Sequence, residues 1–115
     1  MQIVVIKHYK QPYENPISVA ANDRVTPDFG KTTDMAGWVW CSADDGRSGW
    51  TPRNWLVHDS GRWKIDRDFD AIELTVEPDE VLNAVLEESG FFWVTRHDGS
   101  AGWIPCEHVS VLERT

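Results

Sequence analysis

The residues with the most evident chemistry in this sequence are aromatic. Seven of the 115 residues are Trp. An indole ring offers a flat apolar face and one N–H donor, so Trp is favoured on surfaces that bind peptides or other proteins. Because a chain of this length cannot bury seven indoles, we expect some of them to form a binding platform at the surface.

Residues that could support catalysis or bind a metal are scarce. His58 and His97 are each followed by Asp, but adjacency in sequence does not orient an imidazole for proton transfer. Cys106 and His108 form one potential ligand pair without the second pair that a zinc site needs. No nucleophile motif and no Gly-rich phosphate loop is present. We therefore expect a binding protein and no enzyme, with no catalytic residues, metal or cofactor.

The charge of the chain limits its partners. Acidic residues outnumber basic residues 19 to 11, which gives a formal net charge of −8. A domain that neutralises phosphates needs a basic face, so we expect neither nucleic acid nor an anionic membrane as a partner. A basic or neutral peptide fits this charge better.

Location is predicted from what the sequence lacks. No segment is long and apolar enough to cross a bilayer. The apolar run in residues 1–7 has no basic leader and no cleavage site, so it predicts a strand and not a signal peptide. Two cysteines, Cys41 and Cys106, are fewer than a disulfide-stapled secreted domain usually carries, and we expect both to be reduced. A cytoplasmic protein, or a fragment of a larger one, is expected.

An internal repeat organises the chain. Residues 37–52 align without gaps with residues 90–105, and seven of the sixteen positions are identical. A weaker match relates residues 17–24 to residues 74–81, and the first copy carries extra residues in the loop 27–36. Such self-similarity predicts two copies of one structural unit.

Both copies have the pattern of β-structure. Asp45-Gly46 and Asp98-Gly99 lie between alternating aromatic segments, which is a strong hairpin signal. Gly49 and Gly102 follow in the returning strands, where glycine often marks a bulge or a close backbone approach. Residues 81–88 could be read as a helix, but the repeat predicts a strand.

Two domains follow from the repeat. Tyr9, near the start of the first copy, aligns with Phe69 near the start of the second. We expect one barrel over residues 1–57 and another over residues 63–115. The short polar segment 58–62 would link them, and a linker this short would bring the two barrels into contact.

The order of motifs in each copy resembles the Src-homology-3 (SH3) family, and the chain as a whole resembles a bacterial-type pair of variant SH3 domains. The first copy contains Tyr9, Ile17-Ser18-Val19, Asn22-Asp23, Gly37-Trp38, Asp45-Gly46, Gly49-Trp50-Thr51-Pro52 and Asn54-Trp55-Leu56. The second contains Phe69, Leu74-Thr75-Val76, Asp79-Glu80, Gly90-Phe91, Asp98-Gly99, Gly102-Trp103-Ile104-Pro105 and Glu107-His108-Val109. The resemblance implies an all-β fold with two small five-stranded SH3-like barrels in tandem.

The resemblance also implies an aromatic groove that binds an extended or proline-rich peptide, because flat rings clamp the ridges of a polyproline-II helix. On the first barrel the groove residues would be Tyr9, Trp38, Trp50, Pro52, Asn54 and Trp55. A second groove would consist of Phe69, Phe91, Trp103, Pro105 and His108.

Two departures from the family pattern affect these expectations. Pro16 occupies a position where the family often has an acid that holds a ligand Arg or Lys, and Asp34 in the enlarged loop could substitute. Glu107 replaces the groove Asn in the second copy. The second barrel is therefore expected to brace or assist the first.

Three functions remain open from the sequence. The first is a protein-interaction module that binds a peptide in trans. The second is a structural scaffold whose aromatic grooves pack between the barrels or against a neighbouring domain. The third is an aromatic cage for a methylated or quaternary ammonium group. Open indoles at Trp38 and Trp55 would favour peptide binding over the scaffold.

Overall fold

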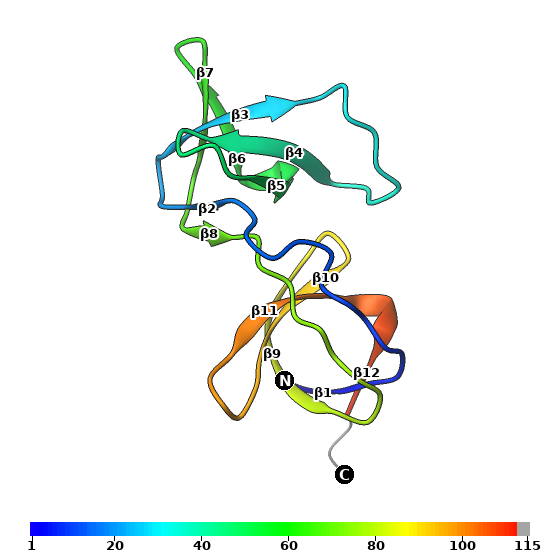
Figure 1. Cartoon of the computed structure of the whole chain (residues 1–115). Coiled ribbons are helices and arrows are strands. Elements are labelled where there is room, and N and C mark those ends of the chain that lie inside the picture. Colours follow the sequence, from blue (N-terminus) through cyan, green and yellow to red (C-terminus); the bar gives the residue numbers. More distant parts are fainter. Residues whose placement is uncertain (113–115) are drawn as a thin grey trace. The chain divides into compact units, whose positions relative to one another are not determined.

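The chain forms two compact β units, and the predicted all-β fold with SH3-like barrels is confirmed (Figure 1). A computed structural model describes residues 1–112. Unit 1 comprises Met1–Glu14 and the described residues from Ile72 onward, and unit 2 is Asn15–Ala71. The described residues include no helix long and apolar enough for a membrane span.

Unit 1 contains a five-stranded antiparallel sheet in the order β11-β10-β9-β1-β12. Its elements are β1 (Gln2–Val5), β9 (Val81–Glu88), β10 (Phe91–Thr95), β11 (Ala101–Pro105), the short 3₁₀ helix η2 (Cys106–His108) and β12 (Val109–Val111). The strand predicted at residues 81–88 is therefore confirmed as β9.

Unit 2 contains a five-stranded antiparallel sheet in the order β5-β4-β3-β7-β6 and a short two-stranded sheet, β2-β8. Its elements are β2 (Ser18–Val19), β3 (Arg24–Asp28), β4 (Trp38–Ala43), β5 (Ser48–Pro52), the 3₁₀ helix η1 (Arg53–Trp55), β6 (Leu56–Asp59), β7 (Arg62–Ile65) and β8 (Phe69–Asp70).

The structure divides the chain at residues other than 57 and 63. In Figure 1 the dark blue β1 lies beside β9 and β12 of unit 1, where Ile3 is paired with both Leu82 and Val111. The expected barrel over residues 1–57 therefore lacks its first strand, which belongs to unit 1. Residues 63–71, which were expected in the second barrel, belong to unit 2. Residues 113–115, which were included in that second barrel, lie outside the described residues.

The reason for the difference is that β7 fills in unit 2 the place that β1 fills in unit 1. Val5 exchanges two backbone hydrogen bonds with the turn before β9: its N–H donates to the Glu80 carbonyl (2.9 Å), and its carbonyl accepts from Asp79 (2.8 Å). Ile65 makes the corresponding pair with the turn before β3, which the repeat aligns with the turn before β9. The two strands are thus equivalent, and each closes one unit.

The segment expected as a linker is a tight hairpin. Residues Leu56–Asp59 and Arg62–Ile65 form paired strands, with Asp59 opposite Arg62. Ser60 and Gly61 between them both have positive φ, 53° and 77°. This combination is typical of the two-residue turns whose twist matches that of the flanking strands. The prediction of a linker at 58–62 was wrong because a polar pair with Gly serves a turn as well as a linker.

The predicted hairpins and close approaches are confirmed. Gly46 and Gly99 have φ of +89° and +88° in the turns after β4 and β10. A Cβ on Gly49 would lie 3.0 Å from the Ile17 side chain, and a Cβ on Gly102 would lie 3.0 Å from backbone atoms. Gly49 therefore lets the segment before β3 (the arm of unit 2) cross closely over its returning strand. Gly102 does the same for the segment before β9 (the arm of unit 1).

The partition of the chain leads to a prediction about where a core substitution acts. Ile3 in β1 and Ile65 in β7 are both fully buried. Truncation to Ala should cost about 2–5 kcal/mol of stability in either case. Ile3→Ala should accelerate amide hydrogen exchange in β9–β12, and Ile65→Ala should do so in β3–β6. Faster exchange of β3–β5 amides in Ile3→Ala would instead support the barrel over residues 1–57.

Candidate functional site

Two of the predicted groove residues lie in the opposite unit from the rest of their predicted groove. Tyr9, expected in the first groove, belongs to unit 1, where it forms an antiparallel bridge with Val76. Phe69, expected in the second groove, belongs to unit 2, where it is paired with Val19. The exchange follows from the partition of the chain, because each aromatic residue follows the strand that closes its own unit.

Most of the other groove residues predicted on the first barrel lie together in unit 2. Trp38 is opposite Pro52 and Trp40 is opposite Trp50 in the β4–β5 hairpin. Alternate residues of a strand point to the same face, so these four side chains share one face of the hairpin. We call this surface the aromatic face. The opposite face carries the buried residues Val39, Cys41 and Thr51.

Two of the predicted groove indoles are not open to water. The exposed fractions are 8% for Trp38 and 4% for Trp55, and Phe69 is also buried. The expectation that Trp38 and Trp55 form an open strip was therefore wrong. Phe69 meets Trp55 edge-on with ring centroids 5.5 Å apart, and the Arg67 guanidinium lies 4.5 Å from the Trp55 centroid. Ring packing and a covering cation thus account for part of the burial of Trp55.

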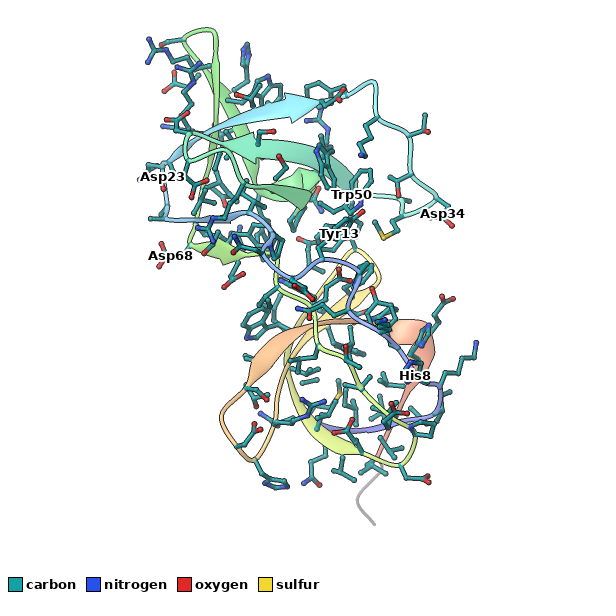
Figure 2. The ribbon with its side chains drawn as sticks, viewed as in Figure 1. His8, Tyr13, Asp23, Asp34, Trp50 and Asp68 are labelled. Carbon is teal, nitrogen blue, oxygen red and sulfur yellow. The ribbon has the colours of Figure 1, made fainter. Side chains whose placement is uncertain are left out.

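The accessible part of the aromatic face is the pair of Trp40 and Trp50. Both are half-buried, and their rings meet edge-to-face with centroids 5.1 Å apart and planes at 77°. The ammonium of Lys31 lies 4.1 Å from the Trp40 centroid and 5.9 Å from that of Trp50. Both distances are within the range at which a cation is attracted to a ring face. Figure 2 labels Trp50 on β5.

Two polar residues of the predicted site are exposed. Asn54 lies in η1 and is exposed. Asp34 lies in the loop after β3, and Figure 2 shows it at the outer end of that loop. Among the described residues no ion pair involves Asp34. It is therefore a surface charge in the loop between β3 and β4.

A second cluster of rings surrounds Trp63 of β7. Phe29 packs edge-on against Trp63 at 5.4 Å, and His58 lies on the same ring at 4.8 Å. The Arg53 guanidinium is 5.0 Å from the Phe29 centroid and 5.4 Å from that of Trp63. Phe29 is 55% exposed, so this cluster stabilises the start of the loop after β3 without sealing it from water.

Four of the five residues predicted for the second groove lie in unit 1, and Tyr9 lies there in place of Phe69. Phe91 is opposite Pro105, and Trp103 is opposite Trp93, in the same register as the hairpin of unit 2. Tyr9 meets His108 edge-on with centroids 5.2 Å apart. Phe91, Trp103 and Pro105 are buried, so this set offers less accessible aromatic surface than Trp40 and Trp50.

One acidic residue of unit 1 is held in an unusual environment. The Tyr9 hydroxyl donates a hydrogen bond to Glu73, which lies in the arm before β9. Burial raises the pKa of Glu73 above its ordinary value of 4.5, although the hydrogen bond from Tyr9 opposes the shift. Burial, followed by the neighbouring Glu73, also raises the pKa of Tyr9. The pair therefore resists ionisation and links the arm to the segment after β1.

The two thiols are unreactive by the same logic. Burial raises the pKa of Cys41 to about 11, and burial together with the Glu87 carboxylate raises that of Cys106 to about 11. A thiol with such a pKa carries almost no thiolate at neutral pH, and the thiolate is the nucleophilic form. Neither cysteine is suited to nucleophilic chemistry.

Three features of these sites were not predicted from the sequence. Lys31 over the Trp pair, Phe29 on Trp63, and Glu73 with Tyr9 all join residues that are distant along the chain. The only signal for Lys31 was its place in the enlarged loop 27–36. By contrast, strand alternation predicts from the sequence that Trp38 and Trp40 share one face and that Val39 and Cys41 share the other.

With the aromatic face described, comparison with known proteins can be considered. Residues 3–58 match the variant SH3 domain family. The match is to a single domain of this family. The matched residues begin in β1 of unit 1 and end in β6 of unit 2. No curated protein and no solved structure matches the chain. A match to a variant SH3 domain suggests a protein-interaction module in general terms.

Glu73 provides a test of the buried acid in unit 1. Because its folded pKa is raised, its contribution to stability is greatest below the unfolded value and is lost as pH rises through the folded value. Glu73→Gln keeps an acceptor for Tyr9 but cannot ionise. The wild type should therefore lose stability relative to Glu73→Gln in urea unfolding as pH rises from below to well above the ordinary value of 4.5. A constant difference across this range would contradict a raised pKa.

Proposed function

We propose that the chain is a protein-interaction module that binds an extended or proline-rich peptide on the aromatic face of unit 2. The observation that carries the proposal is the register of the β4–β5 hairpin, which places Trp38, Trp40, Trp50 and Pro52 on one face. Trp40 and Trp50 are the accessible rings of this set, and Asn54 is an exposed hydrogen-bonding group. The match to the variant SH3 domain family supports the proposal.

The chemistry of the face suits a polyproline-II segment. Such a segment has three residues per turn and no internal hydrogen bonds, so its pyrrolidine rings can pack on flat indoles while its carbonyls accept hydrogen bonds. Its stiffness lowers the entropy lost on binding. The indole N–H of Trp50 can donate to one of those carbonyls.

The exposure of each ring determines its role in the proposed peptide site. Trp38, at 8% exposure, acts as the floor beneath the peptide, and Trp40 and Trp50 provide the contact surface. Tyr9 has no part in this site because it belongs to unit 1. Phe69 supports Trp55 from below. The residues that contact the peptide are thus a smaller set than the family pattern implies.

A structural scaffold without a peptide ligand is the second candidate. It is favoured by the burial of Trp38, Trp55 and Trp103, whose exposed fractions are all below 10%. Under this proposal the rings contribute hydrophobic stabilisation within the folded chain and bind nothing in trans. The two candidates differ in whether Trp40 and Trp50 respond to added peptide.

An NMR titration with a library of proline-rich peptides tests the first candidate. A binding peptide should shift the indole N–H signals of Trp40 and Trp50, and Trp50→Ala should weaken binding at least about tenfold, because truncated aromatic anchors commonly cost that much. The matched control is Trp93→Ala, which removes the ring equivalent to Trp40 from unit 1.

The control must leave peptide affinity unchanged, and the amide spectra of both variants must retain their dispersion. If no peptide of the library shifts the Trp40 and Trp50 signals, peptide binding on this face is wrong and the scaffold is favoured.

A further inference from the structure

The strand that closes each unit comes from the other copy of the repeat. β1 stands at the start of the first copy, but it closes unit 1, whose other strands come from the second copy. β7 stands shortly before Phe69, the residue that aligns with Tyr9, and so at the start of the second copy, but it closes unit 2. The two copies have therefore exchanged their first strands within one chain.

The two closing strands are tethered differently. β7 follows β6 through the two-residue turn Ser60-Gly61, so it always lies next to the sheet that it closes. β1 is separated from β9 by a stretch of chain that includes all of unit 2, Asn15–Ala71. A tether of this length gives a strand an effective concentration on the order of 1 mM or less. A strand from another molecule can therefore compete with β1, but not with β7.

The segment that follows β1 also belongs to unit 1. Tyr9 exchanges two backbone hydrogen bonds with Val76 (3.0 and 2.8 Å), and the Gln11 N–H donates to the Thr75 hydroxyl oxygen (3.0 Å). We call residues 1–11 the closing segment. Since its attachment to the rest of unit 1 is non-covalent, another molecule can supply the same segment.

The link between the closing segment and unit 2 is short and contains proline. Residues 12–14 separate the closing segment from Asn15, the first residue of unit 2. Pro12 begins this link, and Pro16 follows it closely. Proline favours extended backbone at the residue before it, so the link resists folding back on itself. Such a link can act as a hinge from which the closing segment reaches another molecule.

The place that β1 occupies in unit 1 accepts few strands. β1 is hydrogen-bonded to β9 on one side and to β12 on the other (Figure 1). Ile3 and Val5 are 0% and 1% exposed and belong to the core of unit 1. A replacement strand must therefore offer two hydrogen-bonding edges and branched apolar side chains at alternate positions. The closing segment of a second copy meets these requirements because its sequence is the same.

We propose that unit 1 accepts the closing segment of a second copy of this chain, so that two chains exchange residues 1–11 and form a closed dimer. The exchange re-forms the same hydrogen bonds and changes only which chain supplies the segment, so the dimer is favoured by concentration. Each chain keeps its own unit 2, and the dimer therefore carries two aromatic faces. This inference goes beyond the proposed function and does not depend on it.

Disulfide capture between two variants tests the exchange. Val4 in β1 is opposite Val81 in β9, neither is fully buried, and such cross-strand neighbours are close enough for a disulfide. Val4→Cys and Val81→Cys are made on separate, differently tagged chains, each with Cys106→Ser. The two are unfolded together, refolded at about 10 μM or about 500 μM, and oxidised. The mixed-chain disulfide should be at least about fivefold more abundant at the higher concentration, which approaches the effective concentration of the tethered strand.

Two controls accompany the capture. A single chain with Val4→Cys and Val81→Cys should form its internal disulfide at the lower concentration. Thr26→Cys and Ser42→Cys on separate chains should form no mixed disulfide, because these residues are opposite each other in β3 and β4 within the uninterrupted unit 2. The exchange is overturned if the internal disulfide forms but the mixed one does not. An equal yield from the unit 2 pair also overturns it, since non-specific contact would then explain the disulfide.

Light scattering on the wild type separates strand exchange from ordinary surface association. An exchanged dimer reverts only after the closing segment leaves unit 1, which disrupts the core of that unit. The dimer formed by refolding at about 500 μM should therefore persist for on the order of an hour or longer after dilution to about 10 μM. A dimer that dissociates as soon as it is diluted, or a chain that remains monomeric after refolding at the higher concentration, would contradict the proposal.

Discussion

A reciprocal pair of backbone hydrogen bonds closes each unit, and the rest of the structure depends on it. In unit 1 the pair joins Val5 to Asp79 and Glu80, and in unit 2 it joins Ile65 to Asn22 and Asp23. A strand that is paired on both sides leaves no open gap in the sheet, and the buried faces of its neighbours can then form a core. Without β1 or β7, the sheet of that unit would be split between its other strands.

The aromatic face follows from the same ordering of strands. Once β3 is fixed against β7, β4 pairs with β3 and β5 with β4, and the register places Trp40 opposite Trp50. The side chains on the inner face make the core. On the outer face Trp38 and Pro52 are buried as well, and Trp40 and Trp50 remain partly at the surface. Packing edge-to-face, together with a cation above them, is how two large rings lie at a surface without full exposure.

The sequence predicted the parts of the structure that local pattern determines. Asp-Gly turns, Gly49 and Gly102, and the alternation within residues 38–43 and 91–95 all report directly on backbone geometry, and each of these predictions was confirmed. The shared face of Trp38 and Trp40 was predicted in the same way, because it follows from the period of a strand.

Local pattern does not determine which of the two equivalent strands, β1 or β7, completes which unit. One such segment precedes Tyr9 and another precedes Phe69, and alignment alone assigns each to the copy that follows it in the chain. The polar pair Ser60-Gly61 added to the error, because a hairpin turn and a linker share the same residue types. Contacts such as Lys31 with Trp40 depend on the tertiary arrangement and leave no periodic signal.

The position of β1 has a consequence for the order of folding during synthesis. Residues 15–71 form unit 2 from one uninterrupted segment, which is complete before β9 leaves the ribosome. The partners of β1 lie about eighty to one hundred residues downstream, and contacts of such long separation form late because the closure of a long loop costs entropy. β1 is thus synthesised before unit 2 but finds its place after it. Until then its backbone amides and the apolar side chains of Ile3 and Val5 stay accessible to chaperones, to proteases and to other nascent chains.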